Sequence, residues 1–329
     1  MEKTHLHKSV IFSALTVFLF TTSNSQADNP DEWGVWRNAD YPVSIYNDMD
    51  THVLADTFHP AESIQTECNR IENKLSSVVD DECMERNLVL SEGMSVNGAP
   101  ILYKEYPPLS ARTPLGRVLL IGGIHGDEYS SVTIVFKWMK TLDQYHSGLF
   151  HWHVIPLLNP DGLLRKKSQR MNSNGVDLNR NFPTPEWEIE TANYWENETY
   201  NDPRRYPGQS ALSEPESRWL TEEIEKFNPD VIVAVHAPTG VVDYDGPKDG
   251  PEKLGRLYLR LIGTYPGSLG NYAGVHKEIP VVTIELPYAG IMPKPKEVSS
   301  IWVDLVRWLR RNLPVQVQSA EKSQDTDPS

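Results

Sequence analysis

From about residue 96, short apolar runs alternate with segments whose apolar residues recur at helical spacing. Four runs are continuous enough to be strands buried on both faces: residues 118–121, 154–158, 231–235 and 281–286. Helical patterns lie between them, over 132–142, after Ser213 and over 298–313. This alternation predicts an α/β fold with a largely parallel sheet flanked by helices. Ligands of such folds bind beyond the carboxyl ends of the strands.

The chain begins with the pattern of a secretory signal over residues 1–27. Lys3 and Lys8 precede an apolar run from Val10 to Phe20, and Ser25-Gln26-Ala27 has small residues where a signal peptidase reads. The run is about half of the ~20 residues that a membrane-spanning helix requires. We therefore expect cleavage, a periplasmic or secreted protein, and no stable membrane association afterwards; an uncleaved anchor is the alternative.

The rest of the chain divides into three parts. We expect an N-terminal extension over 28–90, a main α/β domain over 91–313 and a disordered tail over 314–329. The 329 residues include 31 Lys+Arg and 45 Asp+Glu, a formal net charge of −14. Nucleic acids and anionic membranes require a basic face, so no nucleic-acid partner is expected.

The two cysteines, Cys68 and Cys83, are too few for a disulfide-rich scaffold or a four-thiolate zinc site. Cys68 lies on the apolar face of a helix predicted near 60–79, and Cys83 follows just past its end. In an oxidising compartment we expect a Cys68–Cys83 bridge, whose closed loop is worth about 3 kcal/mol in the chain-entropy model. The alternative is two buried free thiols.

Polar residues with metal-binding chemistry stand where the predicted strands end. His125 and Glu128 are three residues apart on a Gly-rich turn after the first run, and His236 directly follows the run 231–235. Hydrolytic zinc requires three protein ligands and an open position for water. We therefore predict one Zn²⁺ per chain, bound by His125, Glu128 and His236.

Glu285 is an ionisable residue inside the last apolar run. A buried glutamate could pair with a structural arginine. Its position near the strand ends favours a catalytic base, which would take a proton from water and later pass it to the leaving group.

A dense polar segment lies between Asn159 and Phe182. It contains Arg170 and the string Gly175-Val-Asp-Leu-Asn-Arg-Asn-Phe182. Arginine suits bidentate recognition of a carboxylate, so the segment is interpreted as an anion clamp. A solvated basic loop is the alternative, and it suits Arg165, Lys166 and Lys167.

These motifs resemble those of the zinc metallocarboxypeptidases, in the same order along the chain and over roughly residues 90–313. They are His125-x-x-Glu128, the Asn159-Pro-Asp-Gly turn, the 175–182 string, His236 and Thr283-Ile-Glu285-Leu. Three further strings resemble the murein peptide amidase branch: Ser213-Glu-Pro-Glu-Ser, Pro266-Gly-Ser-Leu-Gly and Ile279-Pro-Val-Val-Thr-Ile-Glu-Leu. That branch cleaves the bond between γ-D-glutamate and meso-diaminopimelate in cell-wall peptides.

The resemblance implies a mixed, largely parallel central sheet with helices on both faces, and it assigns roles to the polar residues. Zinc would be held by the three predicted ligands, with Glu285 as general base and then acid. Asn179 and Arg180 would hold the free carboxylate of the released residue, and Arg170 would stabilise the oxyanion, with Lys167 as an alternative contributor. The family also uses a mobile tyrosine, for which Tyr265 and Tyr272 both remain candidates.

The expected function is therefore a zinc-dependent peptidase acting on a peptide next to a terminal carboxylate. A cell-wall muropeptide is the leading substrate. The alternatives are a carboxypeptidase that removes C-terminal L-amino acids, a deacylase of N-acyl amino acids, and a non-enzymatic peptidoglycan-binding protein with a vestigial site. An intact Glu285 beside three metal ligands argues against the last of these.

Overall fold

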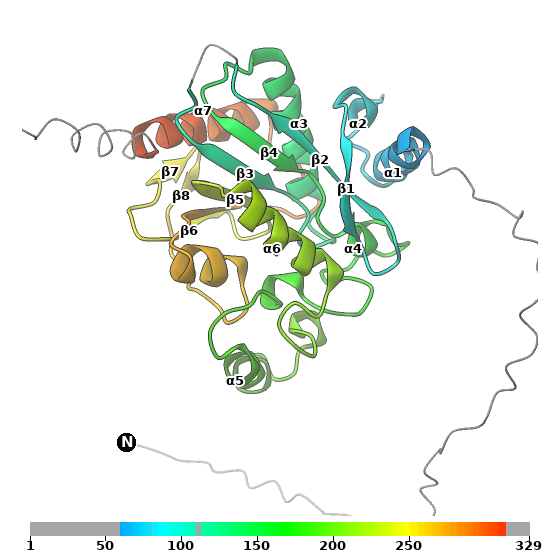
Figure 1. Cartoon of the computed structure of the whole chain (residues 1–329), viewed down its shortest axis with the longest axis vertical. Coiled ribbons are helices and arrows are strands. Elements are labelled where there is room, and N and C mark those ends of the chain that lie inside the picture. The colour runs from blue at the N-terminus through cyan, green and yellow to red at the C-terminus, as the bar shows by residue number, and fades with distance from the viewer. Residues whose placement is uncertain (1–59, 80, 110–112, 314–329) are drawn as a thin grey trace, which may run out of the picture. The chain divides into compact units, whose positions relative to one another are not determined.

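The computed structural model describes residues 60–79, 81–109 and 113–313 (Figure 1). The predicted signal, the first half of the predicted extension and the predicted tail lie outside the described residues. No helix in the described part of the chain is both long and apolar enough to cross a membrane.

Within the described residues, the central sheet has seven strands in the spatial order β1-β2-β4-β3-β5-β9-β6. Their bounds are β1 Val89–Met94, β2 Pro100–Tyr106, β3 Arg117–Ile121, β4 His151–Ile155, β5 Val231–His236, β6 Val241–Asp245 and β9 Val281–Glu285. The four central strands β4, β3, β5 and β9 are parallel, and the strands outside them are antiparallel. The predicted mixed, largely parallel sheet is therefore confirmed. A small hairpin is formed by β7 Lys253–Leu254 and β8 Leu257–Tyr258.

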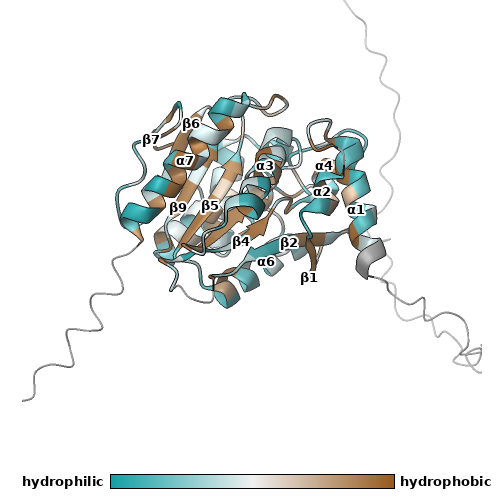
Figure 2. Ribbon diagram, turned by 90° about the horizontal axis from the view of Figure 1, so that it is seen from above, coloured by the Kyte–Doolittle hydropathy of each residue, from teal (hydrophilic) through white to brown (hydrophobic). Residues whose placement is uncertain are grey.

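Helices cover both faces of this sheet, as predicted. In Figures 1 and 2, α3 and α7 lie on one face and α6 lies on the other. The helices are α1 Pro60–Lys74, α2 Glu82–Glu85, α3 Tyr129–Tyr145, α4 Pro160–Leu164, α5 Trp187–Asn193, α6 Pro215–Phe227 and α7 Pro295–Asn312. Shorter helical turns are η1 Leu178–Arg180, η2 Tyr194–Glu198, η3 Pro203–Arg205 and η4 Gly270–His276.

The core forms on both faces because successive strand residues point to opposite sides of a sheet. In β3, Val118 and Leu120 join the cluster of α3 and α7, whereas Leu119 and Ile121 join that of α6. All four side chains are fully buried. Figure 2 shows the same pattern as apolar strands between helices whose outward residues are hydrophilic.

Two predicted boundaries are wrong. The strand predicted over 154–158 is β4, which ends at Ile155, although Leu157 and Leu158 beyond it remain buried. The helix predicted near 60–79 ends at Lys74, yet Leu75 is buried in the following turn. In both places tertiary burial continues past the regular element, so the apolar pattern alone overestimates its length.

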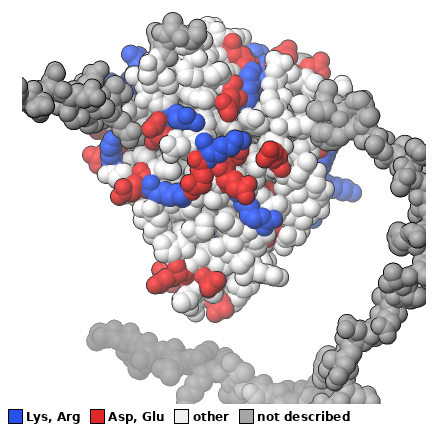
Figure 3. All heavy atoms as spheres, viewed as in Figure 1, with Lys and Arg blue, Asp and Glu red and all other residues white. Residues whose placement is uncertain are grey.

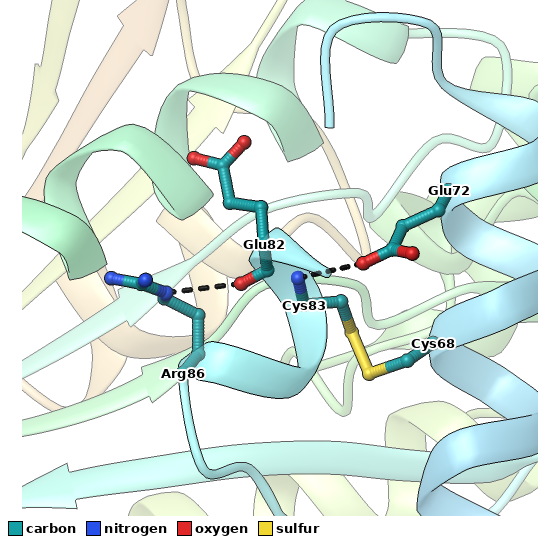
Figure 4. Close-up of a disulfide and its surroundings, with 5 residues drawn as sticks. All are labelled: Cys68, Glu72, Glu82, Cys83 and Arg86. Atoms are coloured by element: carbon teal, nitrogen blue, oxygen red, sulfur yellow. Dashed lines mark hydrogen bonds between the residues drawn. A yellow bond between two sulfur atoms is a disulfide. The ribbon is translucent and has the colours of Figure 1, made fainter. Parts of the chain in front are cut away.

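The expected Cys68–Cys83 disulfide is present and joins α1 to α2 (Figure 4). Its two Cα atoms lie 5.3 Å apart. The backbone N–H of Cys83 also donates to Glu72 Oε1 at 2.9 Å, a second link between the two helices. The cysteines belong to the hydrophobic cluster that contains α3, so this part of the extension packs onto the main domain.

Charged side chains of both signs are interspersed over the face shown in Figure 3. The acidic excess of the sequence therefore does not form a single-sign surface on that face.

Candidate active site

The candidate site lies at the carboxyl ends of three neighbouring parallel strands. His125 follows β3 after a turn in which Gly123 adopts a φ of +63°, a conformation that favours glycine. Glu128 directly precedes α3. His236 is the last residue of β5 and lies in register with Glu285, the last residue of β9. The sheet thus brings together side chains that are 160 positions apart, since 285 − 125 = 160.

His125, Glu128 and His236 form one buried cluster whose ligand atoms all lie within 4.8 Å of one another. His125 Nδ1 is 2.7 Å from Glu128 Oε1, and His236 Nδ1 is 3.1 Å from Glu128 Oε2. The two Nδ1 atoms are only 3.1 Å apart. At most one proton can lie between two facing ring nitrogens, whereas a cation would be coordinated by both. Two imidazoles and one carboxylate are a donor set of hydrolytic zinc, so these residues fit that ion.

Glu128 is ionised in this cluster. Burial disfavours its charge, but the imidazoles of His125 and His236 outweigh that effect and hold the pKa of Glu128 well below its usual range. Its Oε2 also accepts a hydrogen bond from the backbone N–H of Ala237, at 3.2 Å. The carboxylate is therefore held in the charged form that a metal ligand requires.

Asp177 lies against the same cluster, although its sequence position assigned it no role. It is fully buried, and its Oδ1 lies 3.1 Å from His125 Nε2. Burial opposes its charge, but Arg170 and then His125 lower the pKa of Asp177 well below its usual range. A carboxylate beside Nε2 keeps the imidazole proton on that nitrogen, so the lone pair of Nδ1 faces the cluster. The signal was a carboxylate between two apolar residues, Val176 and Leu178, in a segment already marked as polar.

Arg170 points its guanidinium at the same cluster. Its Nη1 lies 3.2 Å from His125 Nδ1 and 3.6 Å from Glu128 Oε1, while its Nε donates to Asp177 Oδ2 at 2.9 Å. Lys167 is exposed and does not line the cavity, so the structure does not bring it to the site.

The cluster opens into a cavity of about 520 Å³, whose lining also includes Arg180, Asn179 and Glu285. Arg180 is 3% exposed, and its Nε has no hydrogen-bond partner among the described residues. Its Nη1 donates to the carbonyl of Asn179 at 2.6 Å. Asn179 Oδ1 accepts from the backbone N–H of Leu269 at 2.8 Å, which orients the amide and leaves its NH₂ group as a donor. The two residues can therefore bind an anion in the cavity.

The structure distinguishes the two candidate tyrosines. Tyr265 lines the cavity, and the Arg180 guanidinium lies 4.5 Å from its ring centroid. Tyr272 is buried against Phe182, with 5.9 Å between ring centroids, and does not line the cavity.

Glu285 is partly exposed on the cavity wall, and its Oε2 accepts a hydrogen bond from the backbone N–H of Thr239 at 3.3 Å. It makes no ion pair with an arginine in the described part of the chain, which leaves its carboxylate available to solvent in the cavity. Four other charged residues line the same cavity and were not singled out in the sequence: Arg205, Asp243, Asp245 and Arg260.

Two imidazoles and a carboxylate converging beside a cavity, at the ends of parallel strands, define a metal-dependent hydrolase. Residues 82–254 match the family model described as zinc carboxypeptidase. The chain belongs to the zinc carboxypeptidase family.

Individual relatives narrow the position of the chain within that family. Murein peptide amidase A of Escherichia coli strain K12 is 30% identical over 223 residues, which cover 66% of this chain and 88% of that protein. Murein peptide amidase A of Vibrio campbellii is 33% identical over 204 residues, covering 60% and 78%. The carboxypeptidase A structure from Helicoverpa armigera matches with a TM-score of 0.56 at 18% identity, over 79% of this chain and 74% of that one. The last match shows the fold, and the first two confirm the resemblance to the amidase branch.

Proposed function

We propose that this protein is a periplasmic or secreted zinc peptidase that hydrolyses the γ-D-glutamyl–meso-diaminopimelate bond of murein peptides. The observation that carries the proposal is one cavity that joins the His125-Glu128-His236 cluster to the buried guanidinium of Arg180, which makes no ion pair with any described residue. A peptide whose terminal carboxylate meets Arg180 would present its last amide bond to the cluster. The relatives named murein peptide amidase A support the cell-wall substrate.

His125, Glu128 and His236 would hold one zinc ion. When bound, zinc supplies a Lewis acid that polarises a carbonyl and activates water at neutral pH. Asp177 would keep His125 in the tautomer that this binding needs, through its contact with Nε2.

Glu285 is the proposed general base and acid. Its carboxylate accepts the proton of the attacking water and returns it to the nitrogen of the leaving residue, so the atom balance closes on a free carboxylate and a free amine. Arg170 donates to the oxygen on which negative charge develops, and loss of one such donor typically costs about 3–4 kcal/mol of barrier.

Asn179 and Arg180 select the end of the substrate. The guanidinium and the amide NH₂ donate to the terminal carboxylate of the residue that is released. Burial lowers the pKa of Arg180, which shows that its charge is poorly solvated in the free protein. A bound carboxylate would place a counter-charge beside the buried guanidinium.

A location outside the cytoplasm is supported by two features. Residues 1–27 have the pattern of a secretory signal, and the Cys68–Cys83 disulfide fits an oxidising compartment. Murein lies outside the cytoplasm, so enzyme and substrate would meet there.

Mass spectrometry of peptides incubated with zinc-loaded protein tests the proposal. We expect the protein to release free diaminopimelate from L-Ala-γ-D-Glu-meso-diaminopimelate, and the Glu285→Gln variant to release it far more slowly. Release of C-terminal residues from ordinary L-peptides, with the tripeptide intact, would instead identify a general carboxypeptidase. Cleavage of N-acyl amino acids alone would identify a deacylase, and binding without any cleavage would identify a peptidoglycan-binding protein.

A further inference from the structure

Strand β6 directs two carboxylates into the cavity. Asp243 and Asp245 are two residues apart, so they lie on the same face of the strand. Asp243 is in register with Thr283 of β9, and Thr283 and Glu285 line the cavity on that same face. The acidic pair therefore belongs to the wall that also carries the proposed catalytic base.

The two carboxylates differ in what they contact. Asp243 is 4% exposed, and its Oδ1 accepts a hydrogen bond from the backbone N–H of Ile262 at 3.1 Å. No described residue donates a hydrogen bond to the carboxylate of Asp245. Burial, followed by the charge of Asp243, raises the pKa of Asp245 to about 7. An unpartnered carboxylate in this environment would be stabilised by a cation in the cavity.

The room for Asp245 comes from a glycine on the neighbouring helical turn. A Cβ at Gly270, in η4, would overlap Asp245 Oδ2, and one at Gly274 would come within 2.6 Å of Asp245 Cβ. Because both positions lack a side chain, η4 packs directly against the end of β6. A side chain at 270 would displace the carboxylate, so Gly270 and Asp245 form a matched pair.

A guanidinium lies on the same cavity as the acidic pair. Arg260 follows β8, and its backbone N–H donates to the carbonyl of Val242 in β6 at 2.8 Å. Its side chain lines the cavity, is largely exposed, and makes no ion pair with any described residue. Arg205 lines the cavity as well, but its Nε lies 4.0 Å from Asp202 Oδ2, so Arg260 is the guanidinium that offers an anion site beside the acidic pair.

These charges have a simple complement. Once Arg180 and Asn179 hold the terminal carboxylate, Asp245 and Arg260 remain for the side chain of the released residue. An apolar side chain would pair with neither charge, and a lysine side chain would pair with Asp245 alone. A side chain that ends in both an ammonium and a carboxylate satisfies both.

We propose that Asp245 binds the side-chain ammonium of the released residue and that Arg260 binds its side-chain carboxylate. Asp243 supports the negative potential and holds the 260–263 loop, while Gly270 leaves the space that Asp245 occupies. This inference rests on the proposed function, and it assigns selectivity for a diamino dicarboxylic acid to residues of β6, η4 and the segment after β8.

Four peptides of the form L-Ala-γ-D-Glu-X separate these contacts. X is meso-diaminopimelate, lysine, α-aminopimelate or alanine, so that the side chain carries both charges, the ammonium alone, the carboxylate alone or neither. The values of kcat/KM are compared as ratios to the alanine peptide. The variants are Asp245→Asn, Gly270→Ala and Arg260→Gln, and the matched control is Asp249→Asn, an exposed carboxylate outside the cavity.

We expect Asp245→Asn and Gly270→Ala to lower the ratios for diaminopimelate and lysine by about 10- to 100-fold. Combining the two changes should cost little more than either one, because both act on a single contact. Arg260→Gln should lower the ratios for diaminopimelate and α-aminopimelate and spare that for lysine. Asp249→Asn should keep the ratios of the unchanged protein.

Equal losses on all four peptides, or ratios in Asp245→Asn within twofold of those in Asp249→Asn, would overturn the inference. Calorimetric binding of free meso-diaminopimelate gives a readout that does not depend on turnover. Its affinity should be about 10-fold weaker in Asp245→Asn than in Asp249→Asn, and equal affinities would likewise overturn the inference. If the unchanged protein cleaves none of the peptides while Asp245→Asn still weakens binding, the proposed function alone is wrong.

Discussion

The role proposed for Glu285 is proton transfer and not zinc binding, because Glu285 lies outside the cluster of ligand atoms. We expect Glu285→Gln to keep zinc and to lower kcat by about 10²- to 10⁴-fold, the usual contribution of a general base. Single-turnover kinetics and metal analysis on the same sample measure both quantities. Near-normal turnover in a zinc-loaded variant would assign the base elsewhere.

Asp177 would act on a bound metal through its contact with His125. Replacing it with Asn removes the charge that holds the His125 Nε2 proton and releases Arg170 Nε. Zinc affinity should fall by about 10- to 100-fold, as is typical for a group that orients a ligand. Competition with a chromophoric chelator measures it. Asp127→Asn is the control, since Asp127 pairs with exposed Arg204, and equal affinities in the two variants would contradict the assignment.

The raised pKa of Asp245 predicts a pH dependence of substrate binding. With a pKa of about 7, the carboxylate is mostly neutral at pH 6 and mostly charged at pH 8. Only the charged form pairs with an ammonium, so KM for the diaminopimelate peptide should fall as pH rises, by about 10-fold relative to the alanine peptide. A pH profile of this KM ratio that is as steep in Asp245→Asn as in the unchanged protein would refute the prediction.

At the residue scale, the site residues that could be predicted from the sequence are those that are neighbours in the chain or that lie at the end of a strand. His125 and Glu128 share one turn, and His236 ends an unmistakable apolar run. Asp177 and Asp245 were not assigned because their partners are set by tertiary contacts: His125 lies 52 positions from Asp177, and Gly270 meets Asp245 only through the packing of η4.

Among the elements, the buried central strands were predictable, whereas the outer strands were not. β3 and β5 are buried on both faces and read as continuous apolar runs, and β9 interrupts its apolar run only with Thr283 and Glu285, which line the cavity. β1 contains polar residues and exposes Glu92, and β6 carries Asp243 and Asp245, so neither strand gives such a run. This difference explains why the acidic pair of β6 went unnoticed.

The disulfide should stabilise the packing of α1 and α2. It closes a separation of 15 residues, which corresponds to about 3 kcal/mol in the chain-entropy model. We expect replacement of Cys68 and Cys83 by Ala together to lower the free energy of unfolding by about that amount, measured by urea denaturation. Reduction of the unchanged protein should give a similar loss, and an unaltered midpoint in both experiments would show that the bridge contributes little.

For the whole molecule, the sheet order converts distant sequence motifs into one site. β5 lies between β3 and β9, so the strand ends that carry His125, His236 and Glu285 are adjacent. A single sequence does not determine the order of strands in a sheet. The alternation of predicted strands and helices did predict a largely parallel sheet that binds ligands at the carboxyl ends of its strands. The family resemblance supplied the remaining step, from three candidate ligands to a hydrolase.

The central claim is that the cluster of His125, Glu128 and His236 binds zinc. The zinc content of the protein tests it most directly, measured by mass spectrometry after metal loading and exhaustive buffer exchange. We predict about one zinc per chain in the unchanged protein and less than about a tenth of that in His236→Ala, with circular dichroism showing that the variant remains folded. A folded, unchanged protein that retains no zinc, or a His236→Ala variant that retains a full equivalent, would contradict the assigned metal site.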